Sequence, residues 1–94
     1  MKIGQKLREL REQKGMLLRE VAANLEIDTA MISKIERDEK SLKREHLARL
    51  SKLFNYSEKE LMTLWLSDKL LSIVENEKLG LDALKLTEKR IKGY

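Results

Sequence analysis

Apolar residues recur along this chain at steps of three and four, the spacing that gathers side chains on one face of an α-helix. Ile3, Leu7 and Leu10 form the first such face, in a helix that we expect to end near Lys14. Gly15 follows directly and supplies a stop, because glycine adopts the left-handed backbone conformation at little cost. The chain is therefore predicted to begin with an amphipathic helix.

Two short helices are predicted next, separated by three residues. The connection Glu26-Ile27-Asp28 ends the second helix, and the Asp28 carboxylate can cap the third, which runs from Thr29 to about Arg37. Two short helices joined by a three-residue turn are typical of a helix-turn-helix unit. The inner face of the second helix is formed by Leu18, Val21, Ala22 and Leu25, and that of the third by Ile32 and Ile35.

The rest of the chain is also predicted to be helical. A polar connection, Asp38 to Ser41, leads to a fourth helix that carries Leu47, Leu50 and Phe54. Ser57 and Glu60 fit a capping box that opens a long fifth helix ending near Asn76. Gly80 marks a break, and a last amphipathic helix spans residues 81–92, with Leu84 and Ile91 facing inward.

Composition agrees with an all-α fold and narrows the chemistry. The 94 residues include no Pro, no Cys and one His, so nothing forbids long helices, and Cys- or His-based metal sites are excluded. The single His46 is interpreted as a surface or half-buried structural residue. An activated nucleophile and a phosphate-binding loop are also missing, so we expect no enzyme, catalytic residue, metal, cofactor or small-molecule ligand.

The distribution of charge divides the chain into two parts. Residues 1–56 carry 13 Lys and Arg against 9 Asp and Glu, whereas residues 57–94 carry 7 against 7. All the excess positive charge lies in the first part, which is where a surface for a polyanion is expected. We therefore divide the chain into a domain of residues 1–56 and a helical extension of residues 57–94.

The third predicted helix carries side chains suited to a DNA groove. Because Ile32 and Ile35 face the core, small and polar residues occupy the opposite side. Lys34 can donate to guanine O6 and N7, a hydroxyl can donate or accept, and a methyl group can contact the thymine methyl. The residues expected to contact base edges are Thr29, Ala30, Ser33 and Lys34.

The segment GMLLREVAANLEIDTAMISKIER, residues 15–37, resembles the helix-turn-helix of lambda-repressor-like regulators, the XRE family. The resemblance extends from about Ile3 to Leu61 and implies a bundle of about five helices, here with a long fifth helix and an additional C-terminal one. It departs from the family at the turn, where Glu26 replaces a glycine, and at Leu18, where a phosphate-contacting Gln is usual.

The resemblance implies a DNA-binding regulator and assigns roles to several residues. An ion pair between Arg11 and Glu36 joins the first and third helices, and two subunits bind a pseudo-palindromic operator with half-sites about 34 Å apart. We expect a repressor that acts as a homodimer. We expect it in the cytoplasm, and at the nucleoid when it is bound to DNA. Basic residues flanking the third helix are expected to contact phosphates: Arg19, Arg37, Lys40, Lys43 and Arg44.

The fifth helix is apolar on two sides, and one small domain can bury only one of them. In one interpretation the last helix folds back over it and completes the core. In the other, which we favour, it forms a dimer interface through Leu61, Met62, Trp65, Leu66, Leu70 and Ile73. An alternative function is an antitoxin or adaptor, including in restriction-modification or toxin-antitoxin control, whose C-terminal helices bind a protein partner.

Overall fold

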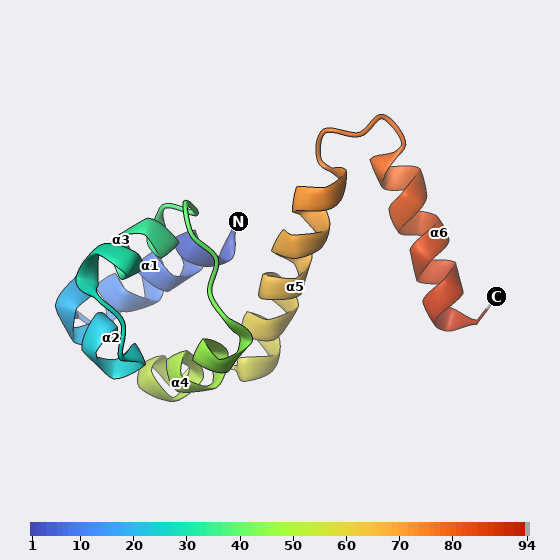
Figure 1. Ribbon diagram of the computed structural model, residues 1–94. Coiled ribbons are helices and arrows are strands. Elements are labelled where there is room, and N and C mark those ends of the chain that lie inside the picture. Colours follow the sequence, from blue (N-terminus) through green and yellow to red (C-terminus); the bar gives the residue numbers. More distant parts are fainter. Residues whose placement is uncertain (94) are drawn as a thin grey trace.

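The computed structural model describes residues 1–93, which form α-helices and, within that range, no strand (Figure 1). The prediction of an all-α fold is confirmed. The fourth and fifth helices contact each other, and the sixth lies apart from the bundle (Figure 1). The helices are α1 (Ile3–Gln13), α2 (Leu18–Leu25), α3 (Thr29–Glu36), α4 (Arg44–Phe54), α5 (Glu58–Val74) and α6 (Gly80–Lys92).

Helix ends lie where local sequence signals place them. Gly15 has φ +66° directly after α1, and the Asp28 carboxylate accepts a hydrogen bond of 2.8 Å from the N–H of Met31 at the start of α3. Glu26 adopts φ 58° in the turn after α2, a conformation that costs a residue with a side chain about 1 kcal/mol or more. The turn therefore keeps its left-handed geometry without the family's glycine.

The start of α5 and the break before α6 differ in detail from the prediction. The Ser57 hydroxyl accepts a hydrogen bond of 3.2 Å from the N–H of Glu60, which is the first half of the expected capping box. The break before α6 lies at residues 75–79, and Gly80 is the first residue of α6. A Cβ atom at Gly80 would lie 2.4 Å from the Val74 carbonyl oxygen, so the glycine is needed for close approach.

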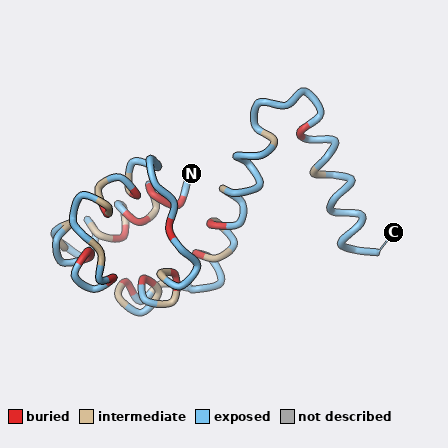
Figure 2. The backbone as a smooth tube through the Cα atoms, viewed as in Figure 1, coloured by how far each residue is buried: buried red, intermediate tan, exposed pale blue. Residues whose placement is uncertain are grey.

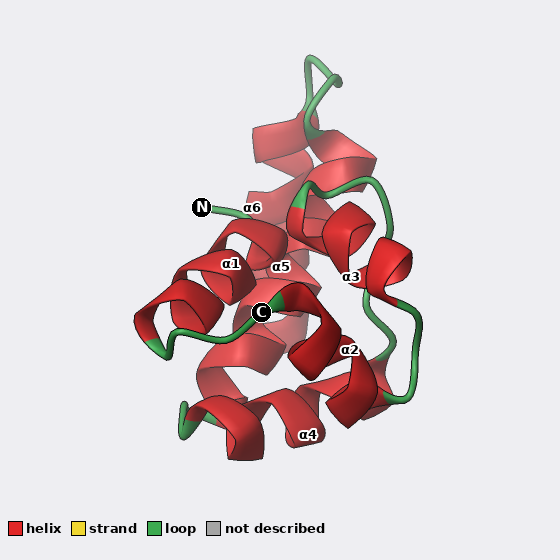
Figure 3. Cartoon of the chain, turned by 90° about the vertical axis from the view of Figure 1, so that its left-hand side faces the viewer, coloured by secondary structure: helices red, strands yellow, loops and turns green. Residues whose placement is uncertain are grey.

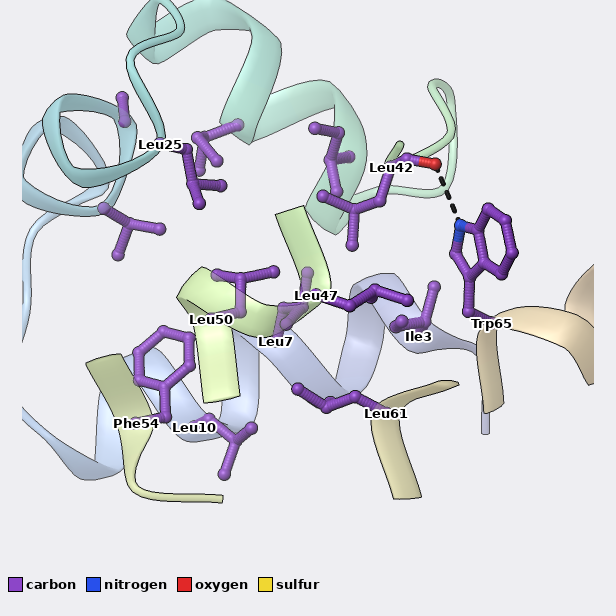
Figure 4. Close-up of a cluster of buried hydrophobic side chains, with 14 residues drawn as sticks. Ile3, Leu7, Leu10, Leu25, Leu42, Leu47, Leu50, Phe54, Leu61 and Trp65 are labelled. Carbon is purple, nitrogen blue, oxygen red and sulfur yellow. Dashed lines mark hydrogen bonds between the residues drawn. The ribbon is translucent and has the colours of Figure 1, made fainter. Parts of the chain in front are cut away.

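One hydrophobic core lies among α1 to α5 (Figures 2 and 4). The α1–α3 crossing is tight, because a Cβ atom at Gly4 would lie 2.2 Å from the Ile35 carbonyl oxygen. The buried hydrophobic residues are Ile3, Leu7, Leu10, Val21, Ala22, Leu25, Ile32, Ile35, Leu42, Leu47, Leu50, Phe54, Leu61 and Trp65.

The core corrects two predicted interface residues. Leu61 is 0% and Trp65 9% exposed, and both pack inside the same chain, so neither is available to a second subunit. A helical wheel shows two apolar stripes on α5 but does not tell which one the domain covers. The other four predicted interface residues, Met62, Leu66, Leu70 and Ile73, lie on a different face, where Met62 is half-buried and the rest are exposed.

The last helix does not complete this core. Figure 2 shows a buried residue at the first turn of α6 and exposed residues along most of the helix. The prediction that Leu84 and Ile91 both face inward is wrong for Ile91, which is 82% exposed, while Leu84 is half-buried. The interpretation in which this helix folds back over the fifth helix and completes the core is also wrong, because no residue of α6 belongs to the core, and Trp65 instead bonds to Leu42 in the loop between α3 and α4.

Candidate nucleic-acid interface

The α2–turn–α3 unit lies on one side of the molecule, which faces the viewer in Figure 3. Ile32 and Ile35 are each 2% exposed and fix the rotation of α3 about its axis. As a consequence Thr29, Ala30 and Lys34 are exposed, and Ser33 is half-buried. A core-anchored helix whose outer face carries small and polar side chains is the arrangement that enters a major groove.

Two of the predicted contact residues bond to each other at the end of α3. The Arg37 guanidinium donates a hydrogen bond of 2.8 Å to the Ser33 hydroxyl and one of 3.0 Å to the Glu39 carboxylate. The bond from Arg37 lowers the pKa of Glu39, and the pKa of Arg37 is raised by the same contact. A phosphate would therefore have to take the place of Glu39 beside Arg37.

The start of α2 has no polar side chain at its cap position, Leu17. The Glu20 carboxylate accepts a hydrogen bond of 2.8 Å from the N–H of Leu17 and takes over part of the capping. Arg19 is exposed between them. This helix end therefore presents one cation and one carboxylate.

The loop between α3 and α4 is anchored to α5. Leu42 is 3% exposed, and its carbonyl oxygen accepts a hydrogen bond of 2.9 Å from the indole N–H of Trp65 (Figure 4). The Arg44 guanidinium lies over the indole ring, 5.4 Å from its centroid. The exposed lysines Lys40 and Lys43 flank the buried Leu42, so this anchor fixes the backbone that carries them.

Two acidic residues, whose capping role was not predicted from the sequence, cap the start of α1. The Asp68 carboxylate of α5 accepts a hydrogen bond of 2.8 Å from the N–H of Ile3, and Asp38 accepts one of 3.3 Å from the N–H of Gly4. The sequence does contain one indication of these bonds: Lys2 occupies the N-cap position of α1, and its side chain cannot accept a hydrogen bond from the helix N-terminus. The missing local acceptor implied that distant groups supply the bonds.

Arg11 and Glu36 form an ion pair that joins α1 to α3. The guanidinium donates hydrogen bonds of 2.7 and 3.0 Å to the two carboxylate oxygens, and a third of 2.9 Å to the Met16 carbonyl. The bonds to Glu36 raise the pKa of Arg11. The two side chains are only 15% and 8% exposed. The pair therefore holds α3 against the rest of the bundle and is not accessible to DNA.

The helix-turn-helix family model matches residues 7–61, more than half of the chain. The chain belongs to this family, the XRE or lambda-repressor-like helix-turn-helix proteins, whose members are DNA-binding regulators of transcription. A comparison with curated proteins found no match. Residues 1–93 contain no group of three or more His, Cys, Asp or Glu side chains placed to hold a metal ion. In the same range no helix is both long and apolar enough to cross a membrane.

Proposed function

We propose that this protein is a sequence-specific regulator that binds double-stranded DNA as a homodimer and represses transcription. The observation that carries the proposal is the rotation of α3, which buries Ile32 and Ile35 and exposes Thr29, Ala30 and Lys34 together. Lys34 donates to a guanine, Thr29 and Ser33 bond to base edges, and the Ala30 methyl contacts a thymine methyl.

Phosphate contacts set the register of α3 in the groove. Arg19 lies at the start of α2, Arg37 at the end of α3, and the exposed cations Lys40, Lys43 and Arg44 follow in the next loop and the first turn of α4. They flank α3 in sequence on both sides and supply affinity that is independent of base sequence.

Two-fold assembly gives the operator its symmetry. A single α3 reads only a short half-site, and two subunits read half-sites about 34 Å apart, one turn of the duplex. The exposed apolar residues Leu66, Leu70 and Ile73 of α5 support self-association. A dimer bound to the operator excludes other proteins from the same DNA, which is the simplest route to repression. The protein would act in the cytoplasm, at the nucleoid when it is bound to DNA.

The same exposed residues support a second candidate function. An antitoxin or adaptor would bind a different protein through α5 and α6, and DNA binding would then be secondary. Purification of the protein from its native extract discriminates between the two. A second protein recovered at one-to-one stoichiometry would favour the antitoxin or adaptor.

Selection of duplexes from a random pool, followed by fluorescence anisotropy at two salt concentrations, tests the main proposal. We expect a pseudo-palindromic sequence to be enriched and to bind two chains, more tightly than unrelated duplexes at both salt concentrations. Recovery of no common sequence, with all binding lost at physiological salt, would contradict the proposal, because non-specific binding is dominated by phosphate contacts.

A further inference from the structure

The apolar surface of α5 and α6 is larger than an isolated chain is expected to expose. Its members are between 42% and 82% exposed, and such a run of exposed apolar side chains over two consecutive helices favours coverage by a partner. Soluble monomers rarely expose more than a few hundred Å² of contiguous apolar surface. We name this set the hairpin surface: Leu66, Leu70, Ile73, Leu79, Leu81, Leu86 and Ile91.

On α5 the hairpin surface forms a single stripe. Leu66, Leu70 and Ile73 follow one another at steps of four and three, so they share one face of the helix. The buried residues Leu61 and Trp65 lie on another face, which packs against the bundle. The exposed stripe of α5 therefore has room for one more helix.

On α6 the apolar residues occupy two nearly opposite faces. Leu81 and Ile91 share a face with the half-buried Leu84, whereas Leu86 lies on the other side, since residues two apart in a helix project in different directions. The helix contacts its own α5 near its first residue, where Gly80 packs against Val74. One neighbouring helix covers only one of these faces, so α6 needs a second.

Charge shows which partner fits. The first turn of α5 carries the acidic Glu58 and Glu60, and the last turn of α6 carries the basic Lys89, Arg90 and Lys92. When α6 packs antiparallel on an α5 helix, the basic turn meets the acidic turn. One chain carries both halves of this match, and residues 57–94 hold 7 basic and 7 acidic residues, so two copies do not repel each other. A second copy of this chain therefore carries charges that match those of the hairpin surface.

We propose that two copies assemble by exchanging α6, so that α6 of each packs antiparallel on α5 of the other in a four-helix bundle. The inference deepens the proposed homodimer and rests on it. At about 1.5 Å per residue, α6 is roughly 20 Å long and covers most of α5, which is roughly 25 Å long. Figure 1 shows α3 at the end of the molecule away from α6, so the bundle leaves both recognition helices uncovered.

Disulfide cross-linking tests the exchange directly, because the chain contains no cysteine. One chain carries Leu66→Cys, and a longer tagged chain carries Leu86→Cys. The two are mixed, unfolded, refolded together and oxidised. Exchange predicts mainly a product of mixed length, because Leu66 and Leu86 lie at the middle of α5 and of α6, and antiparallel packing of the two helices brings them to the same level. Lys85→Cys in the tagged chain, on the polar face of α6, is the control and should cross-link poorly.

Two results would overturn the exchange. A main product that joins two Leu66→Cys chains would show direct pairing of α5 helices instead. The absence of any cross-linked product would show that the hairpin surface does not pair with a second copy, and that a different protein or the chain's own α6 covers it.

Light scattering on the full chain separates this inference from DNA binding. We expect a dimer for the unmodified chain and for Lys85→Glu, and a monomer of unchanged helicity for Leu86→Glu. A dimeric Leu86→Glu variant would overturn the exchange alone. An unmodified chain that is monomeric yet binds its selected duplex would overturn both the exchange and the proposed homodimer, and would leave DNA binding in place. A dimer that binds no duplex would overturn the proposed regulator function and leave the exchange in place.

Discussion

The indole N–H of Trp65 donates a hydrogen bond of 2.9 Å to the carbonyl oxygen of Leu42, which joins α5 to the loop between α3 and α4. Both residues are at least nine-tenths buried, so water does not replace this bond. The loop carries Lys40 and Lys43, two of the proposed phosphate contacts. The position of these cations therefore depends on a helix that lies outside the helix-turn-helix unit itself.

Replacing Trp65 with Phe should destabilise the protein. The substitution keeps an aromatic ring but leaves the Leu42 carbonyl without its donor, which costs about 1–3 kcal/mol in a buried site. Urea unfolding followed by circular dichroism measures the loss. Thr63→Val is the control, because the Thr63 hydroxyl bonds to the Lys59 carbonyl on the exposed side of the same helix. Equal stability of Trp65→Phe and the unmodified protein would contradict the role of the bond.

The Arg11–Glu36 ion pair should behave as a unit. Glu36→Leu leaves a mostly buried guanidinium without its carboxylate and should destabilise the protein by about 3–5 kcal/mol. Arg11→Met should destabilise the protein by a similar amount, because it leaves the mostly buried Glu36 carboxylate without its guanidinium. The double variant removes both charges and should recover much of the loss, as measured by a double-mutant cycle in urea unfolding. Additive losses in the double variant would show that the two charges act independently.

Acid should weaken the fold through His46. Burial lowers the pKa of this side chain below its usual 6.5, and its Nδ1 atom accepts a hydrogen bond of 3.3 Å from the N–H of Lys43. The unfolded chain therefore takes up the proton first, and stability is lost as pH falls from about 6.5 to the lower pKa of the folded state. The urea concentration at the unfolding midpoint, measured between roughly pH 7.5 and pH 5, should decrease across this pH range.

His46→Gln is the matched control for this pH dependence. Glutamine at the third position of a helix also accepts a bond from the cap residue but does not titrate. The variant should keep a nearly constant urea midpoint through the same window. A midpoint that falls equally in both proteins would assign the pH dependence to other groups.

Arg44 should contribute affinity without sequence preference. Arg44→Ala is expected to weaken binding to all duplexes alike and to lower the slope of log K against log salt by about one. Arg49→Ala is the control, since Arg49 is an exposed arginine of the same helix that pairs with Glu26 at 3.7 Å and lies outside the proposed footprint. An unchanged salt slope for Arg44→Ala would remove Arg44 from the footprint.

The helices could be predicted because their signals are local. Gly15, Asp28 and Ser57 act on the residues beside them, and the apolar steps of each segment determine which side is buried. The ion pair of Arg11 and Glu36 followed from the family pattern. These features depend on short stretches of sequence or on a resemblance that extends through the bundle.

The relation of α5 to the rest of the molecule could not be predicted in the same way. The two apolar stripes of α5 are equivalent in sequence, and the path of the loop around Leu42 decides that Trp65 lies inside. The caps that Asp68 and Asp38 provide for α1 join residues 65 and 34 positions apart, a separation that helical periodicity does not report. The exposure of Ile91 depends on how α6 leaves the bundle.

The Lys34→Ala variant tests whether α3 reads base sequence. Affinities are measured by fluorescence anisotropy on the selected duplex and on a scrambled duplex of the same composition, with Lys52→Ala on α4 as the control. We expect a loss of about 1–3 kcal/mol on the selected duplex and little change on the scrambled one. Equal losses on both duplexes, or no loss on either, would contradict the claim that α3 determines sequence specificity.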